Sequence, residues 1–289
     1  MNIKNLYIII LLTHLTVLAC SQVVHVEINN DGQVEITPSQ EFLKEKKVTR
    51  VSYEYSTKKP NQIIKSNSDS KTETYNSSGK LLELKQRNHI AGTTVKSHIK
   101  NDYVNGKLSC KLEKDHIGYI RTYFSYSGDT IFEHSYRAAH YDPQENTTIP
   151  LDSTFINSSY SVTRSNVTRY FNKNGLHIKT TYTERDSLNL LASERLTYTL
   201  SAQKILRTYS YNAEGLCSGL SLTHESGTKT FKYFYDHMNV LERMEEWEER
   251  KNVIALELVY NANGWLDAII RQNPENNHIK ITKLSYKTD

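Results

Sequence analysis

What this 289-residue chain lacks narrows its chemistry before any motif is considered. It has only 11 glycines, 5 prolines and 3 cysteines, and it has no Cys-x-x-Cys pair or His/Cys cluster to form a metal site. Its net charge of +4 is spread along the chain, without the basic patch that a nucleic-acid binder normally concentrates. The nucleophile elbow, the zinc-protease helix motif, the P-loop and the dinucleotide fingerprint are also missing. We therefore expect no nucleic-acid partner, no cofactor and no enzymatic activity.

Two polar stretches are the remaining candidates for chemistry. His134 and His140 lie near each other in the sequence, but a surface histidine pair is far commoner than a pair of metal ligands. The acidic pairs at 245–246 and 248–249 could provide the two carboxylates of a glycosidase. Adjacent carboxylates on a strand point to opposite faces, so a solvated edge is the better interpretation. We assign no metal ligand and no catalytic residue.

The first 19 residues have the anatomy of a cleaved signal peptide. Lys4 precedes an apolar run from Leu6 to Leu12, which is too short for the roughly 20 apolar residues that span a bilayer. Val17-Leu18-Ala19-Cys20 resembles the bacterial lipobox, with Val17 where that motif usually has Leu. We predict that Cys20 is the lipid-attachment residue. An ordinary signal peptide with a cysteine beside the cleavage point is the alternative.

Lipidation at Cys20 would fix where the protein works. A diacylglycerol on the thiol and an amide-linked acyl chain together give stable attachment, because a single chain binds membranes only weakly. By resemblance to Gram-negative lipoproteins, Ser21 rather than Asp after the cysteine favours the outer membrane. The membrane is thus one expected partner, and an envelope protein or a glycan is a second. The sequence leaves open whether the protein faces the periplasm or the cell surface.

The other two cysteines, Cys110 and Cys217, lie in strand-like segments. An oxidising compartment permits a disulfide between them. Cysteines without a spacing constraint are more often small buried hydrophobic residues. The sequence favours two free thiols and leaves the bridge open.

The chain contains 20 tyrosines, and many belong to a degenerate Tyr-Asn-x-x-Gly-x-Leu repeat. The aligned Tyr211, Tyr235 and Tyr260 are 24 and 25 residues apart. The interval of 40 from Phe171 to Tyr211 leaves room for one copy that has lost the signature. The copies begin at Tyr75, Phe171, Tyr211, Tyr235 and Tyr260, with a shortened one at Tyr103 and worn ones at Tyr53 and Tyr123.

The repeat predicts hairpins. Asn or Asp can fold its side chain back onto the backbone, and Gly takes positive φ without steric cost. Alternating apolar residues flank the turns, so one period comprises two strands and two turns. We predict an all-β fold, an antiparallel meander of hairpins in an extended, curved or spiral sheet, with an open or closed barrel-like sheet as the alternative. The predicted structural turn glycines are Gly79, Gly106, Gly175, Gly215 and Gly264.

One segment competes with this pattern. Residues 241–250 contain many helix-forming residues, with apolar side chains at 241, 244 and 247. Their position in the repeat predicts a strand, and we favour the strand because tertiary pairing overrides propensity.

The repeat resembles the YD-repeat (Rhs-type) family, whose signature is Tyr-Asp-x-x-Gly followed by Leu. The likeness covers roughly residues 48–289, with a gap. Only Tyr235-Asp236 keeps the Asp, and that copy has Asn239 in place of Gly. The resemblance implies hairpins winding into a spiral or shell, without a catalytic domain.

The expected organisation follows these features. Residues 1–19 are the signal peptide. Residues 20–47 are the lipidated cysteine and a tether with a short hairpin around Asn30-Asp31-Gly32 and a short helix capped near Ser39. Residues 48–140 and 169–289 are two β-repeat halves, and 141–168 is a long polar loop between them.

Two functions fit this organisation. The first is a non-enzymatic structural or interaction module, lipid-anchored at the outer membrane. The alternative is a carrier that holds a lipid or other lipophile on a curved sheet, which would require an apolar concave face. The recurring tyrosines favour the first.

Overall fold

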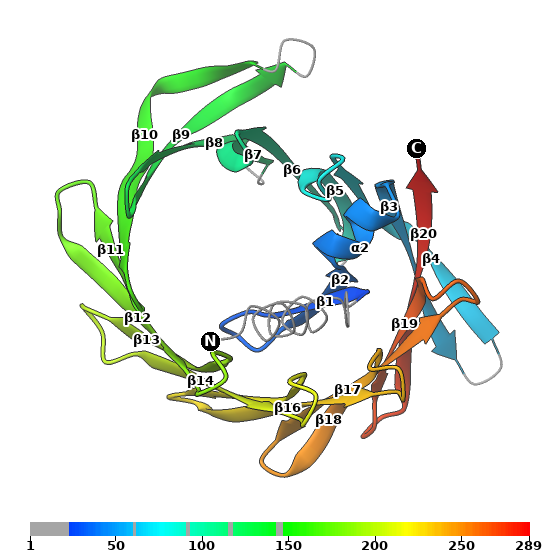
Figure 1. Cartoon of the computed structure of the whole chain (residues 1–289). Helices are drawn as coiled ribbons and strands as arrows, with labels where there is room; N and C mark the ends of the chain where they lie inside the picture. Colours follow the sequence, from blue (N-terminus) through cyan, green and yellow to red (C-terminus); the bar gives the residue numbers. More distant parts are fainter. Residues whose placement is uncertain (1–22, 60–61, 91–92, 115–117, 143–146) are drawn as a thin grey trace, which may run out of the picture.

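A closed antiparallel barrel makes up most of the protein (Figure 1). The computed structural model describes residues 23–59, 62–90, 93–114, 118–142 and 147–289. Eighteen strands, β3 to β20, follow one another around the ring, and β20 pairs with β3 to close it. The predicted all-β meander is therefore confirmed, and the sheet takes the barrel form that was the alternative to a spiral.

The strand bounds follow the hairpin pattern of the sequence. The barrel strands are β3 (Val48–Lys59), β4 (Gln62–Tyr75), β5 (Leu81–Ile90), β6 (Thr93–Val104), β7 (Lys107–Lys114), β8 (Tyr119–Ser127), β9 (Thr130–Asp142), β10 (Thr147–Arg164), β11 (Val167–Asn172), β12 (His177–Arg185), β13 (Leu191–Tyr198), β14 (Lys204–Tyr211), β15 (Cys217–His224), β16 (Gly227–Tyr235), β17 (Leu241–Glu248), β18 (Lys251–Tyr260), β19 (Leu266–Asn273) and β20 (His278–Thr288). Before them come β1 (Val24–Ile28), β2 (Val34–Pro38) and α2 (Gln40–Glu45).

The structure confirms the strand predicted at 241–248 and contradicts most of the loop predicted at 141–168. Residues 241–248 form strand β17, as the repeat predicts, although their composition favours a helix. The predicted polar loop at 141–168 is wrong over most of its length, because β10 occupies Thr147–Arg164 and pairs with β9 and β11. Its weak periodicity reflects register shifts in the β9–β10 pairing.

The signature turns share one hydrogen-bond pattern. In the turn after β14, the Asn212 side chain accepts from the backbone N–H of Leu216, and Gly215 N–H donates to the Asn212 carbonyl at 3.0 Å. The five predicted turn glycines have φ between 72° and 77°, which favours glycine over residues that carry a Cβ.

The copy without a signature lies at 185–191. Asp186 accepts hydrogen bonds from Leu188 and Leu190 N–H at 2.9 Å, and Asn189 takes the positive φ that Gly has elsewhere. This turn follows β12, so it lies at the same end of the barrel as the turns after β14, β16 and β18. We call this end the signature mouth and the opposite end the far mouth. The Gly175 turn follows β11 and lies at the far mouth. This copy of the repeat therefore turns at the opposite end of the barrel from the others named here.

The tyrosine of the repeat connects neighbouring hairpins. Tyr260 OH donates to the Leu241 carbonyl at 2.7 Å, which lies just after the preceding signature turn. The same bond, between 2.7 and 3.1 Å, recurs from Tyr103 to Leu81, Tyr126 to Leu108, Tyr211 to Leu191, Tyr235 to Cys217 and Tyr286 to Leu266. The recurring tyrosine is thus a structural link between repeats.

The described part of the segment expected to tether the body to lipid lies inside the barrel. Strands β1 and β2 form the predicted hairpin, and Ser39 caps α2 by accepting from Phe42 N–H at 3.2 Å. Figure 1 shows this hairpin and helix within the ring. We call residues 24–45 the plug. A barrel of this many strands is too wide for its own side chains to fill, and the plug supplies part of the missing core.

The main hydrophobic core lies between the plug and one part of the wall. Residues opposite one another in the strand pairing share a face. The side chains that β13 to β20, β3 and β4 contribute to the core cluster point inward onto the plug. Phe42 makes edge contacts with Trp265 and Tyr286, at 5.5 and 6.0 Å between ring centroids. We call β13–β20 with β3 and β4 the plugged arc. Its most buried wall residues include Val51, Leu222, Phe231, Met244 and Leu266.

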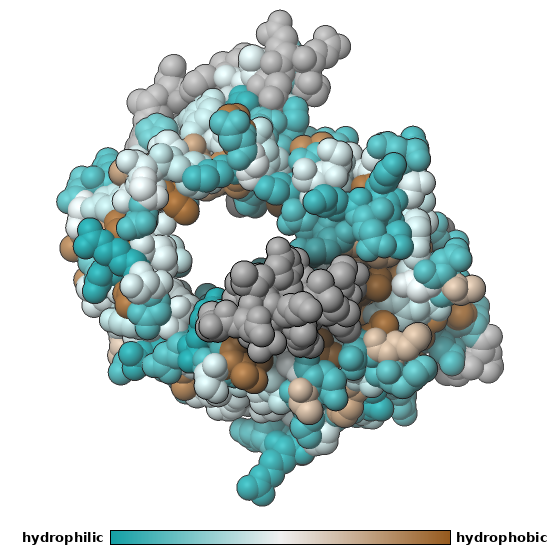
Figure 2. Space-filling view, in the orientation of Figure 1, coloured by the Kyte–Doolittle hydropathy of each residue, from teal (hydrophilic) through white to brown (hydrophobic). Residues whose placement is uncertain are grey.

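Strands β5 to β12, the open arc, are organised the other way round. Their inward residues are mostly polar, and an opening remains beside the plug (Figure 2). The described buried apolar residues of this arc lie on the outer face, where Leu112 is opposite Arg121 and Arg121 is opposite Tyr136. Inward-facing members of the open arc include Ser97, Lys111, Glu113, Thr122, Ser135, Ser159, Ser161, Thr168 and Thr181.

Candidate functional site

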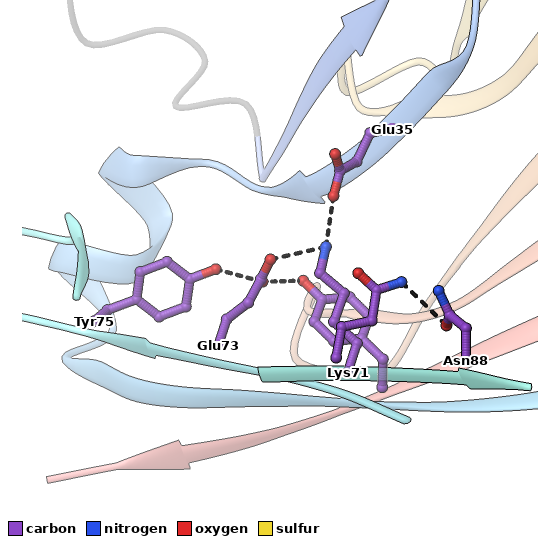
Figure 3. A network of polar contacts seen from close by, with 7 residues as sticks. Glu35, Lys71, Glu73, Tyr75 and Asn88 are labelled. Carbon is purple, nitrogen blue, oxygen red and sulfur yellow. Dashed lines mark hydrogen bonds and ion pairs between the residues drawn. The ribbon is translucent and has the colours of Figure 1, made fainter. Parts of the chain in front are cut away.

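A buried polar cluster joins the plug to the barrel wall (Figure 3). Lys71 on β4 contacts Glu35 of the plug at 2.5 Å and Glu73 of its own strand at 2.8 Å. Glu73 also accepts from the hydroxyls of Tyr53 at 2.5 Å and Tyr75 at 2.6 Å. Only 4% of the Glu73 side chain and 8% of the Lys71 side chain are exposed, so each charge depends on its partners.

The pKa values within this cluster follow from burial and charge. Burial lowers the pKa of Lys71, but Glu73 and Glu35 outweigh it, so the pKa is raised overall and the ammonium is kept. Burial, reinforced by the negative charge of Glu73, raises the pKa of both Tyr53 and Tyr75. Both phenols therefore stay protonated and act as donors. These contacts hold the plug to the wall, and we call Glu35, Lys71, Glu73, Tyr53 and Tyr75 the clamp.

Two further wall cations contact the plug or lie beside it. Arg207 on β14 donates to Asn30 Oδ1 at 2.7 Å and lies 3.6 Å from Glu194. Lys229 on β16 pairs with Glu246 at 3.0 Å and with Glu248 at 2.8 Å. Its side chain also covers the plug turn, where a Cβ on Gly32 would lie 2.6 Å from Lys229 Cδ. Wall charges thus position the plug across the lumen.

A cavity of about 720 Å³ remains between the plug and the wall formed by β3, β4, β19 and β20. This volume is within the range of small-molecule sites. The cavity contains cationic, amide, hydroxyl and apolar groups. They include Arg271, Lys280, Gln86, Asn88, Tyr55 and Leu256.

A second cavity of about 860 Å³ lies on the other side of the plug, where α2 approaches the turn after β4. Gln40 donates through its amide to the Ser78 carbonyl at 3.0 Å, so the start of α2 is held at the signature mouth. Glu35 and Glu27 line both cavities, which places the plug hairpin as the partition between them.

The outer cluster of the open arc is packed beneath the β9–β10 hairpin. Arg121 donates to Cys110 Sγ at 3.3 Å and to Thr148 at 3.3 Å. Tyr119 and Tyr141 pack with ring centroids 5.7 Å apart. Cys110 is buried and Cys217 half-buried, and both are free, in line with the favoured interpretation of these residues.

The other candidates from the sequence are scattered or differently placed. Cys20 lies outside the described residues. His134 bonds to Ser158 at 2.9 Å, and the described part of the chain holds no group of His, Cys, Asp and Glu suited to a metal. Glu245 and Glu246 do face opposite ways, but the expected solvated edge is wrong there. Both are buried and paired, with Arg243 and Lys229 respectively.

Sequence reasoning missed the clamp and the cavity. Lys71, Glu73 and Tyr75 alternate along β4 and therefore share one face, which marks a polar inner surface. From this alternation in the sequence, the polar inner face of β4 could have been predicted. Their partner Glu35 is distant in the sequence, and nothing local connects it to Lys71.

Comparisons with known proteins assign no family. No family model and no curated protein matches the sequence. Among solved structures, a porin-like protein from Bacteroides uniformis aligns at 10% identity over 84% of this chain and 97% of its own, with a TM-score of 0.37. A porin-like protein from Bacteroides vulgatus aligns at 12% identity over 83% and 98%, with a TM-score of 0.27. A DUF1329 family protein from Desulfovibrio piger aligns at 7% identity over 86% and 89%, with a TM-score of 0.24. Likenesses at this level carry no conclusion about function.

Proposed function

We propose that this chain is a lipid-anchored, non-enzymatic binding module of the bacterial cell envelope, attached at the outer membrane and built of YD-like hairpins. The main support is the division of the lumen. The plug covers the apolar part of the inner wall, and mostly polar residues line the inner wall of the open arc. Such a lumen suits a polar ligand or partner.

The position of the plug indicates how an anchor would orient the barrel. The Val23 carbonyl accepts from Ser39 N–H at 2.9 Å, beside the helix that contacts the turn after β4. Three peptide steps separate Val23 from Cys20, which reach at most about 11 Å. Acyl chains on Cys20 would therefore hold the signature mouth toward the bilayer and leave the far mouth accessible.

The outer wall favours a barrel that stands on the membrane rather than in it. Membrane barrels have an apolar outer band and a polar interior. Here charged residues alternate outward even beside the most apolar inner wall, where exposed Glu257 separates buried Leu256 and Leu258. Arg50, Lys85, Arg195, Lys232 and Lys283 take the same outward, exposed position on other strands. None of the described helices is long and apolar enough to cross a membrane.

Replacing Cys20 tests the anchor. Cys20→Ala should abolish incorporation of labelled palmitate, because the thiol that carries the diacylglycerol is lost, whereas Ser21→Ala should keep the label. The label is the decisive readout, since an uncleaved signal peptide can itself hold a chain at the membrane. Unchanged labelling of Cys20→Ala would refute the anchor.

The carrier alternative predicts a lipid bound inside the barrel, and this distinguishes it from the proposed binding module. A chain beginning at Ser21 has no covalent acyl group, so any lipid extracted from it with organic solvent was bound in the barrel. We expect no stoichiometric lipid in the extract by mass spectrometry, because the plug already occupies the apolar wall. One lipid per chain would favour the carrier.

A further inference from the structure

The cavity between the plug and the β19–β20 wall lies toward the far mouth. Arg271 and Lys280 are two residue pairs from the end of that hairpin, where Asn273 pairs with His278. They also line a smaller hollow that continues to this hairpin end, alongside Ile254. A ligand from solution could thus enter from the side opposite the proposed membrane contact.

Two cations in this cavity differ from the three wall cations described above, Lys71, Arg207 and Lys229. Arg271 and Lys280 sit directly opposite each other across β19 and β20. Within the described residues, neither side chain forms a hydrogen bond or an ion pair with a protein group, whereas the side chains of Lys71, Arg207 and Lys229 all contact acids.

The pKa of the Asp69 carboxyl is lowered mainly by its hydrogen bonds with Ser66 and His89, and the charge of Lys280 lies near enough to help lower it. No described carboxylate contacts Arg271 or Lys280 directly. Two adjacent cations without a directly bonded acid form a site for an anion. The guanidinium fork of Arg suits a carboxylate in particular.

The remaining lining suits hydroxyl groups. Gln86 and Asn88 on β5 are linked by a hydrogen bond of 3.2 Å, which leaves further amide donors and acceptors for a ligand. The Tyr55 ring, Leu256 and Ile269 supply apolar surface. Carboxylates also line the cavity, at Glu27, Glu35 and Asp69, and carboxylates accept hydrogen bonds from hydroxyls.

A simple inorganic anion would leave these amides and carboxylates unused. A neutral sugar would leave the cation pair unmatched. The combination of a cation pair with amides and carboxylates matches a molecule that has one or more carboxylates and many hydroxyls.

We propose that this cavity binds an acidic carbohydrate, with a uronate carboxylate between Arg271 and Lys280 and sugar hydroxyls on Gln86, Asn88 and the cavity carboxylates. This inference rests on the proposed binding function and specifies its ligand class. The plug forms one wall of the site through Glu27 and Glu35, so the bound sugar contacts both plug and barrel.

Isothermal titration calorimetry with trigalacturonate tests the site, with maltotriose as the neutral comparison. The full-length, membrane-extracted protein should bind trigalacturonate at least about tenfold more tightly than maltotriose, because charge-assisted hydrogen bonds are involved. Arg271→Gln and Lys280→Gln should each weaken trigalacturonate binding about tenfold or more. Lys283→Gln removes the same charge from the outer face of β20 and should leave binding unchanged.

A measurement on the unaltered protein guards against variants that fold poorly. Raising the salt concentration from 0.05 to 0.5 M should weaken trigalacturonate binding severalfold through screening, and should leave weak maltotriose binding unaffected. Absence of trigalacturonate binding, equal affinity for the two sugars, or equal loss in Lys283→Gln would each overturn the assignment. These outcomes leave the proposed anchor and binding role to be judged by palmitate labelling and by lipid extraction.

Discussion

The two arcs of the barrel use the same hairpin repeat to place their cores on opposite faces of the sheet. In the plugged arc, Phe231 and Met244 point inward and are fully buried against the plug region. In the open arc, Leu112 and Cys110 are buried on the outer face, beneath the β9–β10 hairpin. The face that a strand buries is therefore determined by what packs against it, while the turns that space the strands stay the same.

This difference indicates where the stability of the barrel resides. The plugged arc combines an apolar core with buried ion pairs, whereas the described open arc has a polar lumen side and a smaller outer cluster. Substitutions at matched positions in the two arcs should therefore differ in their cost.

The largest contrast should come from aromatic truncation. Phe231→Ala should lower the free energy of unfolding by about 3–5 kcal/mol, because it leaves a cavity between wall and plug. Phe132→Ala in the open arc should cost about 1 kcal/mol, since Phe132 is 44% exposed. Urea unfolding followed by circular dichroism measures both. Equal losses would mean that the plug adds no core to its arc.

The clamp gives the next contrast. Lys71→Met should cost about 3–5 kcal/mol in the same assay, because it leaves Glu73 buried without its cation. Lys111→Met in the open arc breaks an ion pair with Glu113 that is 35% and 44% exposed, and should cost less than about 1 kcal/mol. A small effect of Lys71→Met would show that Glu73 is satisfied by its tyrosines alone.

The clamp should also have an alkaline limit. Because the folded pKa of Lys71 is raised, its contribution is fully present below the unfolded lysine value of about 10.4 and is lost as pH rises through the folded value. The stability difference between the unaltered protein and Lys71→Met should therefore shrink above about pH 10. A constant difference from pH 8 to 11 would argue against the ion pair.

The smallest contrast concerns two turn glycines with similar φ, 72° at Gly79 and 77° at Gly175. Gly79→Ala should cost about 2–3 kcal/mol, because a Cβ there adds a clash with the Gln40 carbonyl of the plug to the strain of positive φ. Gly175→Ala should cost about 1 kcal/mol, since its Cβ would meet only the Tyr160 hydroxyl, at an ordinary 3.7 Å. Thermal melting compares them, and equal shifts would mean that α2 does not press on the β4–β5 turn.

The sequence predicts the features of this fold that local chemistry determines. The turns around Gly215 and Gly264, the plug hairpin and the Ser39 cap all depend on residues within a few positions of one another. Closure could not be predicted in the same way, because the β20–β3 pairing joins opposite ends of the repeat region. Alternation with a period of two identifies two faces without indicating which one is inside.

The candidate site is also only partly predictable. Arg271 and Lys280 could be expected to share a face once the last hairpin was assigned, because they flank it symmetrically. The opposite wall of the cavity, with Gln86 and the plug residue Glu35, comes from distant parts of the chain. The lipid attachment predicted at Cys20 and the resemblance to YD repeats remain predictions.

The pairing of β20 with β3 also constrains the order in which the protein is made. Thr49 on β3 bonds to the Lys287 carbonyl, 238 positions later, so this seam forms only after β20 has left the ribosome. The plug is synthesised before the strands that surround it, and the ring closes only when β20 pairs with β3. Contacts of such sequence separation form slowly. Until then, the apolar face of the plug and the unpaired edges of β3 and β20 are open to other chains, so closure is the step at which this protein is most exposed to misassembly.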